Sequence, residues 1–197
     1  MCFRCRQPCS LSSCSPGFNR PLQWRNLYLF WYPILFLILP SFLGGLRIPA
    51  RGTLGLMVLG TLITAFSEEA IYRGVVLHAL LATGVMRAVF ATSLLFGLLH
   101  ISKVILGASL LEVLPITVAA TTARIGYAAL RLRTGSIWPI ILFRFAFNLV
   151  SNITTPETIP SLIAFLSIAV SVGFLAYGLF LLREGWMPIT QQRFRRP

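Results

Sequence analysis

Six stretches of mainly apolar residues, separated by short polar or basic segments, form the dominant pattern of this chain. They cover approximately residues 26–46, 53–83, 88–101, 104–130, 137–153 and 159–182. A helix that crosses a membrane needs about 20 consecutive apolar residues. The second stretch is longer than that, so its helix is expected to be steeply tilted or broken. The pattern predicts an all-α, polytopic transmembrane helical bundle with about six spans.

Composition favours a membrane protein over a soluble domain. Of the 197 residues, 56% are hydrophobic and 11% are charged, and the mean hydropathy is +0.81. The net charge of +12 comes from sixteen arginines and one lysine, a balance that in a soluble protein would suggest nucleic acid. Here most cations flank apolar stretches, and no basic face is interleaved with aromatic residues. The predicted surroundings are the lipid bilayer, and nucleic acid is not a predicted partner.

The same pattern divides the chain into four segments. These are a basic arm (1–25), a first span and loop (26–52), a core (53–152), and a last span with a basic tail (153–197). If the N-terminus is cytoplasmic, eleven cations lie in inner segments and three in outer ones. We therefore predict an integral, multi-pass protein with both termini in the cytoplasm, located in the cell membrane, which is the inner membrane if the source is bacterial.

The N-terminal arm contains four cysteines at spacings that leave its role open, namely Cys2, Cys5, Cys9 and Cys14. Spacings of this size are compatible with a zinc site. Cysteines beside basic residues and before a span are also compatible with palmitoylation. An arm without fixed structure, or one that lies upstream of the true start, is the plainer interpretation.

Two adjacent carboxylates interrupt the second apolar stretch, in the sequence SEEAIYR at 67–73. An ionisable side chain inside a membrane is costly, and it therefore indicates a functional site. On a helix, Glu69 and Arg73 have the spacing of an ion pair. That pair leaves Glu68 free, on a helix face that it shares with Tyr72. Glu68 is therefore the candidate general base, while the alternative for Glu69 and Arg73 is a purely structural lock.

Other polar residues inside the apolar stretches add to this picture. Arg124 and Arg144 fall within spans, as Arg73 does, and each needs an acidic partner or a water-filled cavity. Arg144, Asn148 and Asn152 lie at spacings of four, which places them on one stripe of the fifth span. A stripe of this kind predicts a face that points into the bundle.

Three of these motifs resemble those of a known family. EEAIYR resembles the EExxxR motif, FGLLH at 96–100 the FxxxH motif, and TGSIWPIILFRFAFN at 134–148 the stretch that ends in HxxxN, all from the CAAX-protease and bacteriocin-processing intramembrane proteases. The resemblance covers about residues 53–152. It implies a helical-bundle endopeptidase in which Glu68 is the general base, His100 orients the attacking water, and Asn148 donates to the oxyanion. Glu69, Arg73 and Tyr72 would support these residues.

The main departure from the family pattern is Arg144, which stands where the motif has histidine. A guanidinium is always charged and has five N–H donors, so it is able to stabilise an oxyanion. It is equally able to hold Glu68 in an inactive salt bridge. The predicted function is therefore an intramembrane endopeptidase that acts on a membrane-anchored or lipidated protein or peptide, and the alternative is a non-catalytic binding or immunity protein of the same fold. Transport is a weaker third possibility.

Metal is not part of the predicted mechanism. Catalytic zinc commonly has three protein ligands, and this chain has only two histidines and no HExxH motif. His78 follows Glu68 by ten residues, which directs it away from Glu68 on a helix, and it is interpreted as structural. We predict no cofactor, although a zinc ion bound by carboxylates stays open.

Overall fold

The computed structural model describes residues 18, 24–43, 45–46, 48–155 and 160–183. Its helices are α1 (Trp31–Leu43), α2 (Arg51–Glu69), α3 (Leu77–Leu80), α4 (Val85–Leu98), α5 (Ser102–Ile105), α6 (Leu110–Thr134), α7 (Trp138–Ile153) and α8 (Pro160–Leu181). Short 3₁₀ helices occupy Trp24–Phe30, Leu81–Thr83 and Leu99–Ile101, and a π-helical segment occupies Ala70–Val76. Two-residue strands, β1 (Gly45–Leu46) and β2 (Thr154–Thr155), pair antiparallel.

The predicted class, an all-α membrane bundle, is confirmed, and each of the six apolar stretches contains a helix. Among the described residues, three helical runs are long and apolar enough to cross a membrane: Gly52–Thr83, Val85–Ile105 and Leu110–Thr134. Shorter apolar helices cover Asn26–Ile38, Trp138–Ile153 and Ile168–Leu181. The second stretch is a single helical run in which a π-helical segment, rather than a break, follows the carboxylates.

One predicted boundary is displaced. The sequence pattern ends the third stretch at residue 101 and starts the fourth at 104, but helix continues through α5 to Ile105 and α6 begins at Leu110. The chain turns at Gly107, whose φ of +97° is accessible to glycine and costly for other residues. Because the residues around this turn are apolar or small, hydropathy alone does not mark it.

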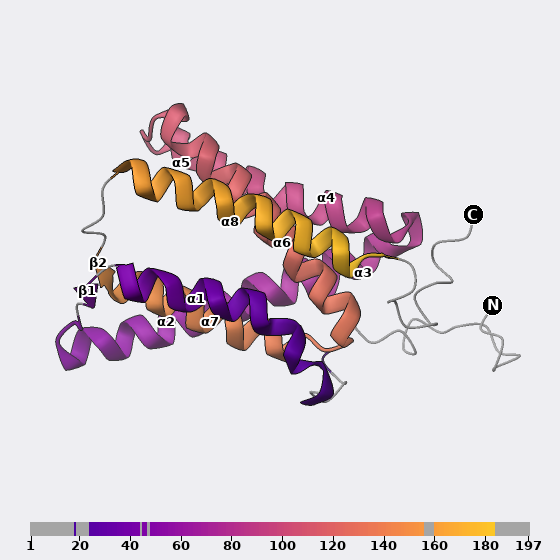
Figure 1. Cartoon of the computed structure of the whole chain (residues 1–197), viewed down its shortest axis with the longest axis horizontal. Coiled ribbons are helices and arrows are strands. Elements are labelled where there is room, and N and C mark those ends of the chain that lie inside the picture. The colour runs from indigo at the N-terminus through magenta and orange to yellow at the C-terminus, as the bar shows by residue number, and fades with distance from the viewer. Residues whose placement is uncertain (1–17, 19–23, 44, 47, 156–159, 184–197) are drawn as a thin grey trace, which may run out of the picture.

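The helices form two layers (Figure 1). α1, α2 and α7 pack in one layer, and α4, α6 and α8 pack in the other. Aromatic side chains join the layers, because the buried Tyr127 of α6 meets both Phe143 of α7 and Phe174 of α8 at centroid distances of 5.6 Å. α6 and α8 approach closely at glycines: a Cβ on Gly178 would come within 3.0 Å of the backbone nitrogen of Gly126. Small residues permit such close helix contacts in membrane proteins.

The first and last described helices meet at one end of the bundle. The hydroxyl of Tyr177, near the end of α8, donates a hydrogen bond to the carbonyl of Leu29, just before α1. Figure 1 shows the start of the Trp24–Phe30 helix and the end of α8 at that end. Which side of the membrane this end faces stays a prediction. The cysteine run of the N-terminal arm lies outside the described residues.

Candidate active site

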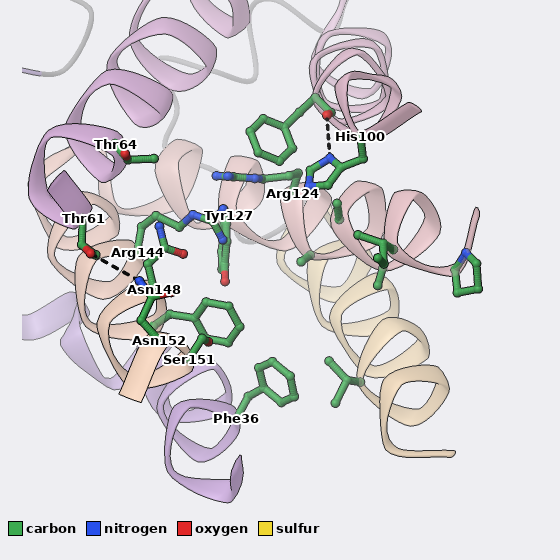
Figure 2. Close-up of a pocket in the computed structure, with 18 of the residues that line it drawn as sticks. Phe36, Thr61, Thr64, His100, Arg124, Tyr127, Arg144, Asn148, Ser151 and Asn152 are labelled. Atoms are coloured by element: carbon green, nitrogen blue, oxygen red, sulfur yellow. Dashed lines mark hydrogen bonds between the residues drawn. The ribbon is translucent and has the colours of Figure 1, made fainter. Parts of the chain in front are cut away.

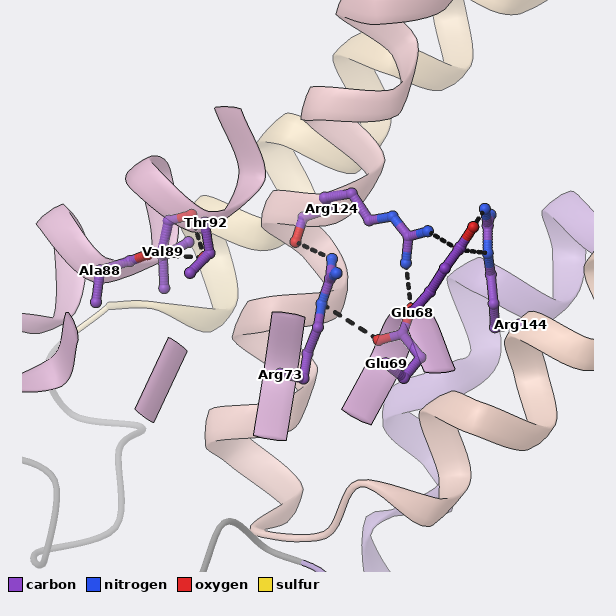
Figure 3. Close-up of polar contacts among 8 residues, drawn as sticks. All are labelled: Glu68, Glu69, Arg73, Ala88, Val89, Thr92, Arg124 and Arg144. Atoms are coloured by element: carbon purple, nitrogen blue, oxygen red, sulfur yellow. Dashed lines mark hydrogen bonds and ion pairs between the residues drawn. The ribbon is translucent and has the colours of Figure 1, made fainter. Parts of the chain in front are cut away.

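Five charged side chains form an alternating chain of ion pairs between α2, α6 and α7 (Figure 3). In spatial order they are Arg73, Glu69, Arg124, Glu68 and Arg144. Arg124 binds Glu69 through Nη1, and its Nη2 lies 2.5 Å from Oε2 of Glu68. Each of the three arginines predicted to need a partner inside the membrane has one.

The predicted pair of Glu69 and Arg73 is confirmed. Arg73 Nε lies 3.3 Å from Glu69 Oε2, and both side chains are almost fully buried. Arg73 also donates through Nη2 to the backbone carbonyl of Arg124, at 3.2 Å. The chain leaves α2 at Glu69 and enters the π-helical segment that carries Arg73. Single π-helical turns within α-helices are frequent at functional sites.

The expectation that Glu68 is free is wrong. Its Oε2 accepts from Nη2 of Arg124 and from Nε of Arg144 at 3.2 Å, and Nη2 of Arg144 lies 3.1 Å from the same oxygen. The helix spacing identified Arg73 as the partner of Glu69, but it could not identify the two arginines that reach Glu68 from α6 and α7. Both guanidinium groups converge on one oxygen. Oε1 accepts no hydrogen bond from any residue that the structure describes, and the Glu68 side chain is 25% exposed.

Phe96, the first residue of the FGLLH motif, is an aromatic platform beneath these charges. The guanidinium carbon of Arg124 lies 3.5 Å from the centre of its ring, within the range of a cation–π contact. Tyr72 meets the same ring edge-on at a centroid distance of 5.0 Å, and His100 lies 5.4 Å from it. Tyr72 and His100, predicted from separate motifs, are thus joined through Phe96.

A cavity of about 760 Å³ lies beside the charged chain (Figure 2). Three of the predicted catalytic residues line it, namely His100, Arg144 and Asn148. The predicted polar stripe of α7 faces this cavity, because Asn152 lines it as well. Glu68 is not a lining residue, but both of its arginine partners are. The cavity is therefore bordered by two cations that Glu68 and Glu69 hold in place.

His100 and Asn148 both have polar atoms without a strong partner. His100 Nδ1 lies 3.4 Å from the carbonyl oxygen of Phe96, a contact that is a hydrogen bond only when Nδ1 carries the proton. Nε2 is then an acceptor. The Asn148 amide makes no hydrogen bond to a described side chain or backbone group, and no hydrogen bond joins His100 to Glu68 in this part of the chain. Their catalytic roles stay predictions.

The sequence was compared with models of protein families. The family model for type II CAAX prenyl endopeptidases, Rce1-like, matches residues 50–150, just over half of the chain. The chain belongs to this family. No curated protein and no solved structure gives a significant match. The matched residues include all five members of the charged chain as well as His100 and Asn148.

The structure of this Rce1-like protein adds two residues to the site. Arg124 was identified as an intramembrane cation in need of a partner, but its contact with both carboxylates depends on how α6 packs and has no local signal. Tyr127 lies one turn further along α6, is 1% exposed, and lines the cavity. Figure 2 shows its hydroxyl directed into that space. An apolar stretch that contains one tyrosine gives no indication of such a position.

The side chains that the structure describes do not fit a metal centre. Within the described residues, no three His, Cys, Asp or Glu side chains lie close enough together to hold a metal ion. Glu68 and Glu69, the carboxylates that such a site would need, each bind at least one guanidinium group, whose positive charge opposes a metal ion. His78 lies on α3 and does not line the cavity. No catalytic step is therefore derived through a metal.

Proposed function

We propose that this Rce1-like protein is an intramembrane endopeptidase that cleaves a membrane-anchored or lipidated protein or peptide by means of an activated water molecule. One observation carries the proposal. Arg124 and Arg144 both bind Oε2 of Glu68 and leave Oε1 without a hydrogen bond from a described residue. A carboxylate held in this way has one fixed oxygen and one that is free to accept a proton from water.

In the proposed reaction, water binds between Glu68 and His100 and attacks the scissile carbonyl carbon. Glu68 Oε1 accepts the proton that the water loses, and the carbonyl oxygen becomes an oxyanion. The C–N bond then breaks and the proton passes to the amine that leaves. His100 orients the water through Nε2, the ring nitrogen that does not face the Phe96 carbonyl.

Arg144 and Asn148 are the proposed oxyanion donors. Arg144 contacts Glu68 through Nε and Nη2, and its Nη1 has no described partner. The ion-pair chain contains one more guanidinium than carboxylate, so it is positive as a whole, and Arg144 is one of its two members that border the cavity. Positive charge placed in advance beside a developing anion is commonly the largest contribution to catalysis.

The cavity walls support a lipidated peptide as the substrate class. The uncharged polar side chains that α2 and α7 contribute to the cavity are Thr61, Thr64, Asn148, Ser151 and Asn152. These side chains are able to form hydrogen bonds with the main chain of a peptide. An acyl chain alone would leave them without hydrogen-bond partners. Facing them is an apolar wall from α1, α6 and α8 that includes Phe36, Ile116 and Val170. The bilayer would deliver such a substrate to the bundle from the side.

A second candidate function rests on the ion pair between Arg144 and Glu68. This is the contact that would make the protein a non-catalytic binding or immunity protein of the same fold, because a carboxylate paired with two guanidinium groups is a weaker proton acceptor than a free one. The two functions predict opposite effects of restoring the family histidine. In the binding protein, Arg144→His would create cleavage that the wild type lacks.

The test is a cleavage assay in liposomes with quenched fluorogenic peptides that end in a farnesylated Cys-aliphatic-aliphatic-X sequence. We expect the wild type to cleave and Glu68→Gln to be inactive although folded in detergent. Arg87→Ala is the matched control, since Arg87 is exposed on α4 and takes no part in the ion-pair chain. Cleavage by Glu68→Gln at the wild-type rate would remove Glu68 from the mechanism.

A further inference from the structure

We infer that Arg124 is a positioning residue, which holds the Glu68 carboxylate so that Oε1 is the oxygen available to water. The inference rests on the proposed function, since it assigns a device that prepares the proposed base. Its basis is the geometry of one guanidinium that contacts two neighbouring carboxylates. Within the part of the chain that the structure describes, both oxygens of Glu69 face an arginine, whereas in Glu68 only Oε2 does.

Arg124 occupies the middle of the ion-pair chain. It donates through Nη1 to Glu69 and through Nη2 to Oε2 of Glu68, at 2.5 Å for the latter. Among the described side chains, only Arg124 bonds to both carboxylates. Figure 3 shows its guanidinium above the two acids with a dashed line to each, and Arg73 and Arg144 on either side. Because Glu69 holds Arg124 in place, rotation of the Glu68 carboxylate would break the contact between its Oε2 and Nη2 of Arg124.

The guanidinium is fixed on its other sides as well. It is 1% exposed and lies 3.5 Å from the centre of the Phe96 ring. Its backbone carbonyl accepts from Arg73, which itself pairs with Glu69. The two carboxylates and the Phe96 ring leave the side chain little rotational freedom. A rigid anchor of this kind is what places a catalytic group within the narrow geometric range that turnover needs.

Electrostatics require such an anchor at this point. Two carboxylates on consecutive residues repel each other, and in apolar surroundings a like charge drives one of them toward its neutral form. Arg124 reaches both acids from a different helix and places a positive charge between them. Arg144 does not have this effect, because it contacts Glu68 alone and is 16% exposed at the cavity. The two arginines on Glu68 thus have separate roles.

The planar fork of arginine is essential to this role. Nη1 and Nη2 bind different carboxylates at the same time, whereas a lysine presents a compact point charge. Arg124→Lys therefore keeps the charge but loses the bridge. We expect its kcat to fall by up to about 10²-fold with KM close to that of the wild type, as a misplaced catalytic group produces. Methylguanidine should restore part of the kcat of Arg124→Ala.

The experiment measures kcat and KM in liposomes with the farnesylated fluorogenic peptide, for wild type, Arg124→Lys, Arg124→Ala and the control Arg133→Ala, which removes a guanidinium from the same helix outside the site. Thermal unfolding of each variant separates loss of fold from loss of turnover. If Arg124→Ala does not fold, Arg124→Lys carries the test. Unchanged kcat per folded molecule in Arg124→Lys would overturn the inference and leave the proposed function intact.

A second readout does not depend on activity. Dicyclohexylcarbodiimide modifies carboxyl groups in apolar surroundings, and mass spectrometry gives its rate at Glu68. We expect several-fold faster modification in the Arg124 variants than in the wild type or Arg133→Ala, because Oε2 loses one of its two arginine partners and the carboxylate is held less firmly. If the wild type cleaves no peptide, the proposed function fails, and this rate alone decides the inference: faster modification supports it, and an equal rate overturns it.

Discussion

Glu68 and Glu69 are adjacent in the sequence and have opposite surroundings. Glu69 is fully buried, with Oε1 bound to Arg124 and Oε2 beside Arg73. Glu68 is 25% exposed, and its two arginines share a single oxygen. A rotation of about 100° per residue along a helix is enough to bury one acid fully and leave the other partly exposed, beside the two arginines that border the cavity. The same chemical group is suited to structure in one place and to proton transfer in the other.

The largest expected effect on turnover comes from replacing each acid in turn with its uncharged amide. Glu68→Gln removes the proton acceptor but keeps the size of the side chain, so turnover should fall to background. Glu69→Gln should leave turnover per folded molecule within about tenfold of the wild type, because Glu69 is fully buried and offers no oxygen to water. Equal losses of kcat in the two variants would contradict the assignment of Glu68 alone as the proton acceptor.

A double variant sharpens the assignment of Glu68. His100→Ala should cost nearly as much turnover as Glu68→Gln, since both residues act on the same water. Residues that act as a unit are not additive, so the double variant should be about as slow as either single variant. Measured kcat values in liposomes give this comparison. Multiplicative losses would mean that His100 acts separately from Glu68.

The next largest effect is expected at Arg144, the residue that faces Glu68 from the cavity. Loss of one oxyanion donor typically lowers turnover about 10²–10³-fold, so Arg144→Ala should fall by that amount. Arg144→Lys should recover only part of it, because lysine lacks the planar fork. Faster cleavage by Arg144→Ala than by the wild type would show that the ion pair with Glu68 is inhibitory.

The two acids also show what the sequence predicts and what it does not. The i,i+4 spacing of Glu69 and Arg73 is local, and the structure confirms the pair at 3.3 Å. The helical class and the apolar stretches were likewise predicted, since hydropathy and length determine them. The partners of Glu68 come from residues 56 and 76 positions away, a distance that no helical periodicity spans. The turn at Gly107 was missed because its neighbours are apolar.

Stability should show the reverse order of the two acids. Glu69→Gln leaves Arg73 and Arg124 with too little negative charge in a buried site, and loss of one partner of a buried ion pair typically costs about 3–5 kcal/mol. We expect a clear drop in the thermal midpoint in detergent. Glu68→Gln should lower the midpoint less, since its side chain is partly exposed. Thermal unfolding of the two purified variants is the direct comparison.

The smallest expected effect is that of a chelator. A metal bound between the two acids would need Glu68, Glu69 and His100 as ligands, but each carboxylate is occupied by guanidinium groups and His100 has no hydrogen bond to either. Prolonged dialysis against a strong chelator should therefore leave kcat unchanged, with a known zinc protease as the positive control. Loss of activity that zinc restores would mean that the arginines move away when substrate binds. The two acids would then both be metal ligands. The proposed mechanism, in which Glu68 transfers protons and Glu69 is structural, would be wrong.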